Sequence, residues 1–304
     1  MDIVEVGPRD GLQNERRALS IDARVQLIRH LVECGARRIE AVSFVRADRV
    51  PQMAGAEEVL AQLPRRPDLS YIGLALNRRG AERAALAGCA EMNIVVPVTD
   101  AFSVRNQNTT VSGMITAAAD CVRIAKEAGI QVTVTLAVAF GCPFSGPVPL
   151  AALESVYTRI AALGVDEIAF ADTIGVGSPR QVLDMAEMTT RHGTKARLRF
   201  HFHNTRNTGY ANAHRAARLV GLPSVALDAS VGGFGGCPFA PKATGNIATE
   251  DLGYLLRQED IPHTSVDLAS LTTTAEWLAQ QLGSPLRSLL PRAGDFPQAP
   301  RTSP

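Results

Sequence analysis

Two histidines, His201 and His203, are separated by a single residue in a run that reads Arg-Phe-His-Phe-His. Residues 197–201 predict a strand, and residues i and i+2 of a strand share one face, so both imidazoles can point into the same space. Two neutral imidazoles and one carboxylate suit a divalent first-row metal. Asp10, at the end of the first predicted strand, is the natural carboxylate for such a site. The alternative is an ordinary polar strand end whose imidazoles are satisfied by hydrogen bonds.

Three charged residues near predicted strand ends could act on a substrate beside that metal. Arg9 precedes Asp10, and a permanent cation there can stabilise an enolate oxygen as charge develops. Its alternative role is a plain ion pair with Asp10 that shapes the turn. Glu40 lies in the second predicted strand and Asp172 directly follows the sixth, and an acid–base role is open to both carboxylates. Taken alone, each is more typical of a hydrogen-bonding strand end.

A cysteine lies in a glycine-rich segment near the end of the candidate core. Cys237 follows four glycines in five residues, 232–236, and precedes Pro238. Such a loop is mobile and lets backbone approach a ligand closely. A thiol on a loop over an active site can deliver or accept a proton. The alternative is a small buried apolar residue, and the loop context favours the functional interpretation.

These residues need a fold that brings strand ends together. Short apolar runs predict strands over residues 3–6, 38–43, 70–75, 91–96, 131–139, 167–171, 197–201 and 224–228. Amphipathic stretches separate them, and several of these helices end in a glycine, which commonly follows a helix C-terminus. Eightfold alternation of strand and helix predicts a (β/α)8 TIM barrel, whose active site forms at the carboxyl ends of the strands. An open doubly wound sheet is less favoured, because no Gly-rich phosphate turn follows the first predicted strand.

The domain organisation follows from what comes after the eighth predicted strand. Residues 249–258 and 268–281 read as extra C-terminal helices. We therefore expect one barrel domain over residues 1–283. The remainder, 284–304, is rich in proline and arginine and predicts a poorly ordered tail.

Composition excludes several classes of function. The 31 basic and 30 acidic residues of this 304-residue chain leave almost no net charge and no basic cluster, so nucleic acid is not an expected partner. No uninterrupted apolar run reaches about 18 residues, so no membrane helix is expected. The five cysteines are scattered without a CxxC pair, which fits a reducing cytoplasm better than a disulfide framework.

Longer motifs around these residues resemble the 3-hydroxy-3-methylglutaryl-CoA lyase family. The first is Val-Glu-Val-Gly-Pro-Arg-Asp-Gly-Leu-Gln-Asn-Glu at residues 4–15. The last is Gly-Phe-Gly-Gly-Cys-Pro-Phe-Ala-Pro-Lys-Ala-Thr-Gly-Asn at residues 233–246, which is similar to the signature loop of the family. Shorter matches lie at residues 39–45, 50–53, 141–144, 172–177 and 248–252. The His-x-His pair alone is shared with synthases and aldolases of the same barrel superfamily.

The resemblance implies a metal-dependent cleavage of a 3-hydroxyacyl-CoA thioester to acetyl-CoA and a 3-oxo acid. It implies Mg²⁺ or Mn²⁺ as the cofactor and a metal site formed by Asp10, His201, His203 and Asn246. By the same resemblance, Arg9 stabilises the enolate and Cys237 protonates it, while Glu40 and Asp172 support proton transfer. Gln13 and Ser43 would line the substrate pocket. The family also makes a homodimer plausible.

Two departures from the family pattern bear on the substrate. After His203 many members continue with Asp-Thr-Tyr-Gly, whereas this chain has Asn204, Thr205, Arg206 and Asn207. Residues 137–140 are apolar and end in Phe140, where small polar residues are usual. We expect Arg206 to contact the substrate and to reshape the acyl end of the pocket. A related lyase or aldolase that acts on another 3-hydroxy acid or acyl-CoA is therefore an alternative function. A condensing synthase and a silent CoA- or metal-binding protein are less favoured alternatives.

Overall fold

The computed structural model describes residues 1–193, 195–219, 225–236 and 245–296. Within those residues, eight parallel strands close into a barrel in the order of the chain. The last strand pairs with the first, with Ile3 opposite Leu227, which closes the sheet. This confirms the predicted (β/α)8 barrel. The strands are β1 Asp2–Glu5, β2 Arg38–Ser43, β3 Ser70–Leu74, β4 Glu91–Pro97, β5 Gln131–Ala137, β6 Glu167–Asp172, β7 Arg197–Phe202 and β8 Val225–Ala229.

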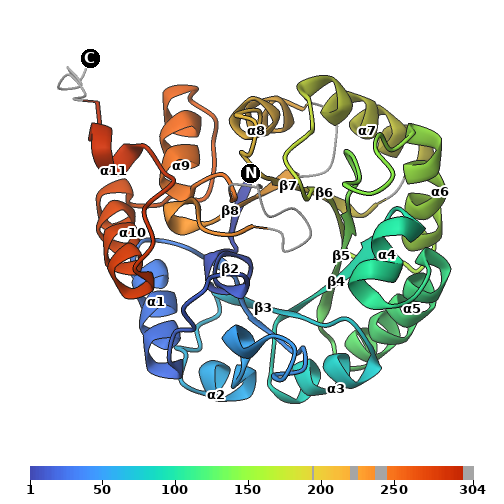
Figure 1. Cartoon of the computed structure of the whole chain (residues 1–304), viewed down its shortest axis with the longest axis horizontal. Helices are drawn as coiled ribbons and strands as arrows, with labels where there is room; N and C mark the ends of the chain where they lie inside the picture. Colours follow the sequence, from blue (N-terminus) through green and yellow to red (C-terminus); the bar gives the residue numbers. More distant parts are fainter. Residues whose placement is uncertain (194, 220–224, 237–244, 297–304) are drawn as a thin grey trace.

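Helices surround the strands, and Figure 1 shows them as a ring around the barrel. Those between strands are α1 Ile21–Glu33, α2 Ala56–Ala61, α3 Arg78–Leu86, α4 Asp100–Gln107, α5 Val111–Glu127, α6 Leu150–Ala161, α7 Pro179–His192 and α8 Gly209–Ala217. After the barrel come α9 Thr249–Gln258, α10 Leu268–Leu282 and α11 Leu290–Ala293. Three short helical turns are η1 Gly7–Gly11, η2 Pro51–Met53 and η3 Val231–Gly233.

Local signals and burial explain these elements. Strands such as β6 are buried at every position, as expected for a parallel sheet that is covered by helices on the outside and filled inside. The α7 helix begins with a capping box in which Ser178 and Gln181 bond reciprocally, and it ends at Gly193 in a left-handed conformation. The core lies between strands and helices, with Leu27 and Val134 among its completely buried members.

Most strand ends lie within one residue of the sequence-based expectation, and three larger details differ from it. The fifth strand ends at Ala137 instead of residue 139, because Val138 adopts a left-handed backbone with φ of 54° and leaves the sheet. The α4 helix was not predicted, since its residues carry little apolar periodicity. Residues 284–296, assigned to a poorly ordered tail, include α11, and the backbone N–H of Leu290 there donates to Asp251 at 2.8 Å.

The α9 helix occupies the residues predicted for it, and α10 matches its prediction except for one added residue at its end. Throughout the described ranges, no helix combines the length and the apolar character that crossing a membrane requires.

Candidate active site

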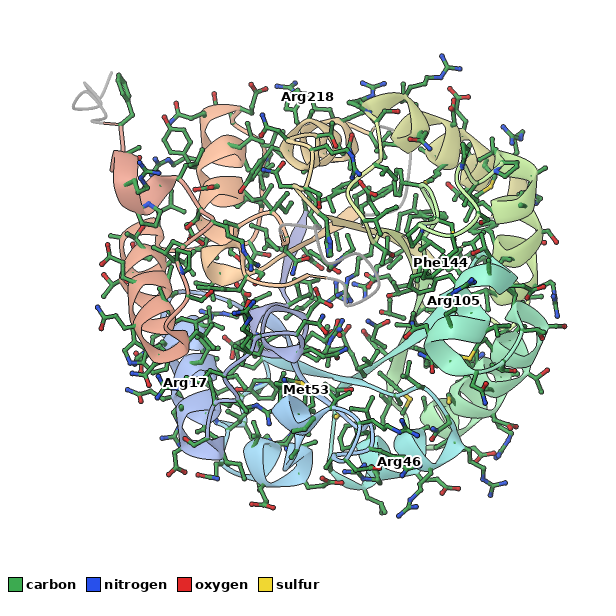
Figure 2. All side chains as sticks on the ribbon, viewed as in Figure 1. Arg17, Arg46, Met53, Arg105, Phe144 and Arg218 are labelled. Atoms are coloured by element: carbon green, nitrogen blue, oxygen red, sulfur yellow. The ribbon has the colours of Figure 1, made fainter. Side chains whose placement is uncertain are left out.

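A cavity of about 670 Å³ opens at the carboxyl ends of the strands, which is within the usual size of ligand pockets. Its floor carries Arg9, Asp10, His201 and His203. Its rim carries arginines and amides, and Figure 2 shows one of them, Arg105, beside Phe144. The basic rim and polar floor are joined by apolar walls formed by Phe44, Val45, Val50, Leu74, Leu76, Val95, Phe102, Ala137 and Ala171.

The turn after β1 aims Arg9 and Asp10 at this cavity. Three successive backbone N–H groups, those of Arg9, Asp10 and Gly11, donate to the carbonyl of Val6, which tightens the chain into η1. Gly7 leaves room at its start for the carboxylate of Glu5, because a Cβ there would lie 2.6 Å from Oε1 of Glu5 and would displace it. The turn therefore places two charged side chains side by side at the mouth of the barrel.

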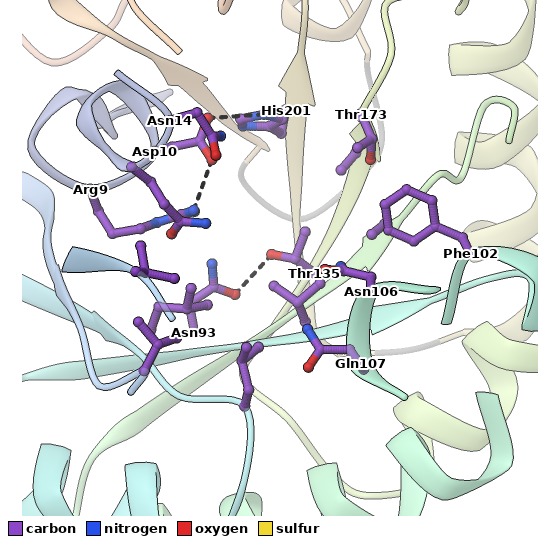
Figure 3. Close-up of a pocket in the computed structure, with 18 of the residues that line it drawn as sticks. Arg9, Asp10, Asn14, Asn93, Phe102, Asn106, Gln107, Thr135, Thr173 and His201 are labelled. Carbon is purple, nitrogen blue, oxygen red and sulfur yellow. Dashed lines mark hydrogen bonds and ion pairs between the residues drawn. The ribbon is translucent and has the colours of Figure 1, made fainter. Parts of the chain in front are cut away.

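Asp10, His201 and His203 form a cluster that could hold a metal ion, since one ligand atom from each lies within 4.8 Å of the others. Nε2 of His201 lies 3.8 Å from Oδ2 of Asp10, while its Nδ1 lies 3.0 Å from Asp228. Asn246 donates through Nδ2 to the same Asp10 oxygen at 2.9 Å. Figure 3 shows Arg9, Asp10 and His201 close together, with Thr173 and Phe102 across the cavity.

Two buried polar atoms beside this cluster indicate a missing partner. Nδ1 of His203 and Oδ1 of Asn246 have no hydrogen-bond partner among the described residues. Buried polar atoms of native proteins are nearly always satisfied, so these two call for an explanation. A divalent cation fits, because imidazole nitrogen and carbonyl or carboxylate oxygen are the donors it prefers.

The electrostatics of the cluster also favour a cation. Burial and the neighbouring His201 lower the pKa of His203 to about 3, so its ring is neutral and able to bind metal. Burial opposes ionisation of Asp10, but Arg9 and the two histidines hold the pKa of its carboxyl well below the usual range. Burial likewise disfavours a charged His201, yet Asp228 and Asp10 outweigh it and raise the pKa of that ring.

Arg9 is held from two sides. Its Nε donates to Oε1 of Glu40 at 2.5 Å, and its Nη1 donates to Oδ1 of Asp10 at 2.8 Å. Burial would lower the pKa of Arg9, but Glu40 and Asp10 raise it above its ordinary value. The guanidinium is therefore a permanent cation with a fixed direction at the cavity floor.

Glu40 and Asp172 lie behind the cavity wall. Glu40 is fully buried and also accepts from Asn93 at 3.1 Å. Asp172 accepts from the backbone N–H groups of Val176 and Gly177, both at 2.8 Å, and so shapes the loop after β6. Burial raises the pKa of Asp172 even though these N–H groups oppose the shift. Neither carboxylate lines the cavity.

The remaining residues predicted for the site differ in whether they line the cavity. Gln13 lines the cavity, whereas Ser43, the last residue of β2, is buried and does not line it. Arg206 is exposed and donates to the carbonyls of Ile174 and Gly175, both at 3.0 Å, so it braces the loop after β6 instead of facing the cavity. Cys237 lies outside the described residues, and its role stays a prediction.

Three residues at the cavity were not singled out from the sequence. Asp228 is the last residue of the predicted eighth strand, and this position could have identified it as the partner of His201. Asn93 and Thr135 lie inside strands, and the Thr135 hydroxyl donates to Oδ1 of Asn93 at 2.8 Å (Figure 3). Strand alternation alone could not show that both face the substrate space.

Two buried glutamates hold the turn that leads into the glycine-rich segment. Glu5 accepts from the backbone N–H of Val231 at 3.0 Å, and Glu250 accepts from that of Gly232 at 3.0 Å. Burial raises the pKa of Glu5 to about 7 and that of Glu250 to about 8. Just beyond, Gly235 is required, because its φ is 124° and a Cβ would lie 2.4 Å from Nδ2 of Asn246.

Glu250→Gln is expected to flatten the pH dependence of stability. Between the ordinary pKa of 4.5 and the folded value of about 8, the folded Glu250 keeps a proton that the unfolded chain has lost. Its contribution to the free energy of unfolding therefore falls as pH rises through this window, by on the order of 5 kcal/mol. Urea unfolding of both proteins from pH 4.5 to 8.5 measures the difference. If the free energy of unfolding changed with pH in the same way in both proteins, Glu250 would not be buried and neutral. Glu127→Gln serves as the control, because Glu127 is exposed.

The sequence and the fold of this chain are similar to those of known lyases. The model of the HMGL-like family matches residues 1–278. The chain is 44% identical to hydroxymethylglutaryl-CoA lyase of Pseudomonas mevalonii, over 96% of this chain and 95% of that protein. It is 40% identical to (R)-citramalyl-CoA lyase of Chloroflexus aurantiacus, over 99% and 98%. A solved HMG-CoA lyase of Acinetobacter baumannii, in complex with coenzyme A and 3-methylmalate, is 35% identical with a TM-score of 0.89, covering 98% of this chain and 97% of that one.

Proposed function

This chain belongs to the HMGL-like family, and we propose that it cleaves 3-hydroxy-3-methylglutaryl-CoA to acetyl-CoA and acetoacetate. The enzyme is a carbon–carbon lyase. The observation that carries the substrate proposal is the cluster of Asp10, His201 and His203 beside the guanidinium of Arg9 on the floor of a large cavity. That arrangement suits a substrate with a hydroxyl, a carboxylate and a thioester.

The reaction makes defined demands on the site. The substrate hydroxyl at C3 gives its proton to a basic group of the site, the C2–C3 bond breaks, and the electron pair of that bond moves into the thioester as an enolate. A proton then adds to C2, which yields acetyl-CoA, while C3 becomes the ketone of acetoacetate. The site must therefore lower the energy of an alkoxide first and of an enolate afterwards.

We assign the metal site to Asp10, His201, His203 and the amide oxygen of Asn246, with Mg²⁺ or Mn²⁺ as the ion. When bound, the ion supplies Lewis-acid chemistry that orients the substrate and acidifies its hydroxyl. His201 is oriented for this task, because its Nδ1 faces Asp228 and leaves Nε2 toward the site.

We assign enolate stabilisation to Arg9, whose charge and direction are set by Glu40 and Asp10. Glu40 and Asp172 are proposed to support proton transfer from positions behind the cavity wall, since neither lines the cavity. Cys237 is proposed as the donor of the proton to C2. Its segment follows Gly236, which lines the cavity.

The coenzyme A arm is proposed to run along the rim, where Arg46, Arg49 and Arg105 meet the amides of Asn106 and Asn108. Guanidinium groups suit phosphate, because their donors pair with its oxygens. Arg105 also stacks on Phe144, with its Cζ 4.4 Å from the ring centroid.

Replacing Arg46 and Arg49 together by alanine is expected to raise the KM for the thioester about 10-fold at low salt and to leave kcat nearly unchanged. These groups would contact a part of the substrate that does not change in the transition state. Steady-state kinetics at several ionic strengths measure the effect. Arg17→Ala is the matched control, because Arg17 is exposed and lies over α1, away from the cavity (Figure 2). A fall in kcat instead of a rise in KM would place these arginines elsewhere in the mechanism.

The proposed activity is tested by incubating the purified protein with Mg²⁺ or Mn²⁺ and 3-hydroxy-3-methylglutaryl-CoA, with acetyl-CoA and acetoacetate read by mass spectrometry. Metal-dependent release of both products supports the proposal, and its collapse in Cys237→Ala supports the role of that thiol. Metal binding without any product from this thioester would refute the named substrate.

A second candidate substrate is (R)-citramalyl-CoA, because a lyase for it is 40% identical to this chain over nearly the whole length. This thioester has the same tertiary hydroxyl and carboxylate but lacks one methylene between them. Its cleavage releases pyruvate instead of acetoacetate. The two thioesters offered at equal concentration are therefore distinguished by the second product.

A further inference from the structure

A buried arginine lies directly beneath the candidate metal site. Arg199 is on β7, two residues before His201 and four before His203, so strand alternation turns all three side chains into the barrel. Its residue surface is 0% exposed, and it does not line the cavity. A fully buried guanidinium is costly unless it is paired, so its partners show what it does.

The partners of Arg199 are three carboxylates. Its Nε donates to Oδ1 of Asp228, and its Nη2 donates to Oε2 of Glu40 at 3.2 Å. Its Nη1 lies 3.8 Å from Oε1 of Glu167. Burial would lower the pKa of Arg199, but Asp228 and Glu40 raise it, so the side chain stays a cation.

The second oxygen of each main partner faces the site. Asp228 uses Oδ2 to hold Nδ1 of His201 at 3.0 Å. Glu40 uses Oε1 to accept from Nε of Arg9 at 2.5 Å. Two chains of contact therefore start at one guanidinium. The first ends at the imidazole proposed to bind metal, and the second ends at the cation proposed to stabilise the enolate.

We propose that Arg199 is a positioning residue that orients His201 through Asp228 and Arg9 through Glu40, which extends the functional motif from His-x-His to Arg-x-His-x-His. This inference rests on the proposed lyase function. The planar fork of arginine can hold two carboxylates in fixed directions, which a single ammonium cannot do. Without it, two buried carboxylates would lose their common cation and repel each other, and both side chains they orient would shift.

A second buried arginine in the same barrel offers a matched comparison. Arg38 on β2 pairs with Glu91 at 2.6 Å and with Glu167 at 3.0 Å. No hydrogen bond or ion pair in the described part of the chain joins either glutamate to Asp10, His201 or His203. If Arg199 contributed only to core stability, replacing either arginine would have the same effect on metal binding and catalysis. If Arg199 is a positioning residue, only its replacement would impair them.

The test compares Arg199→Met and Arg199→Lys with Arg38→Met in the full chain. Mn²⁺ affinity is measured without substrate by electron paramagnetic resonance, the melting temperature by calorimetry, and kcat and KM at saturating Mn²⁺. We expect Arg199→Met to weaken Mn²⁺ binding about 10- to 100-fold and to lower kcat more than it changes KM. Arg199→Lys should restore part of the Mn²⁺ affinity and part of kcat. Arg38→Met should lower the melting temperature and leave Mn²⁺ affinity within about 2-fold.

Equal Mn²⁺ affinity and kcat in Arg199→Met and in the unchanged protein would overturn the proposal, and so would equal losses of Mn²⁺ affinity in Arg199→Met and Arg38→Met. If Arg199→Met does not fold, Arg199→Lys decides: a fall in kcat at constant KM supports the proposal, and unchanged kinetics refute it. Mn²⁺ binding by the unchanged protein without thioester cleavage refutes only the named reaction. Absence of Mn²⁺ binding by that protein refutes the metal site, and the role of Arg199 with it.

Discussion

Asp10→Asn is expected to abolish nearly all lyase activity by removing the anionic ligand of the proposed metal site. The substitution keeps the shape of the side chain but removes the charge that draws a cation toward His201 and His203. Loss of an outer partner of a metal ligand already weakens metal binding about 10- to 100-fold, so loss of a ligand charge should cost at least about 100-fold. We expect kcat/KM to fall about 1000-fold, a few kcal/mol of lost transition-state stabilisation.

Mn²⁺ titration followed by electron paramagnetic resonance, combined with kinetics across a wide range of Mn²⁺ concentrations, measures both effects. Asp184→Asn is the matched control, because Asp184 pairs with Arg180 on the outer face of α7 and does not line the cavity. Recovery of full kcat at high Mn²⁺ would mean that Asp10 contributes affinity alone. Unchanged Mn²⁺ affinity would rule out Asp10 as a ligand.

Arg9→Met is expected to lower kcat about 100- to 1000-fold while Mn²⁺ still binds. Arg9 presents a fixed cation to the cavity, and removal of one preorganised donor from a developing oxyanion typically costs this much. The proposed ligand atoms of Asp10, His201 and His203 remain, but Arg9 is an outer partner of Asp10, so metal affinity should fall by no more than about 10- to 100-fold and is made up by saturating Mn²⁺. The two variants therefore separate metal binding from enolate stabilisation.

Single-turnover kinetics with saturating Mn²⁺ measure the chemical step of Arg9→Met. Arg24→Met is the control for loss of a buried arginine, since Arg24 is 1% exposed and donates to the carbonyl of Ala54, away from the cavity. Arg9→Lys should recover little activity, because an ammonium cannot face Glu40 and Asp10 with the same fork. A kcat near that of the unchanged protein would remove Arg9 from the mechanism.

The barrel was predictable because its signals are local. Buried runs such as the one that became β6 are bounded by turn residues, and helices such as α7 carry their own caps. These preferences depend on neighbours a few residues away, so they can be read along the chain. The end of β5 was not predictable in this way, because the left-handed turn at Val138 has no glycine to announce it.

The location of the candidate site was predictable, but its contacts were not. Residue type and strand position alone predict that Arg9, Asp10, His201 and His203 face the mouth of the barrel, and all four line the cavity. Arg206 looked like a substrate contact from sequence, but the structure directs its guanidinium to the carbonyls of Ile174 and Gly175. The direction of a long side chain depends on which acceptors the fold brings near it.

The chain alone thus carries the strand–helix alternation and the kinds of functional group available, because both depend on residue type and short spacing. Folding decides which groups meet. Asp10 and Asn246 are 236 positions apart and share a hydrogen bond only because β1 closes against β8. Arg199 is an extreme case, since nothing near it in sequence shows that its partners come from β2 and β8. Contacts across a closed barrel depend on strand order and register, which no short window of sequence contains.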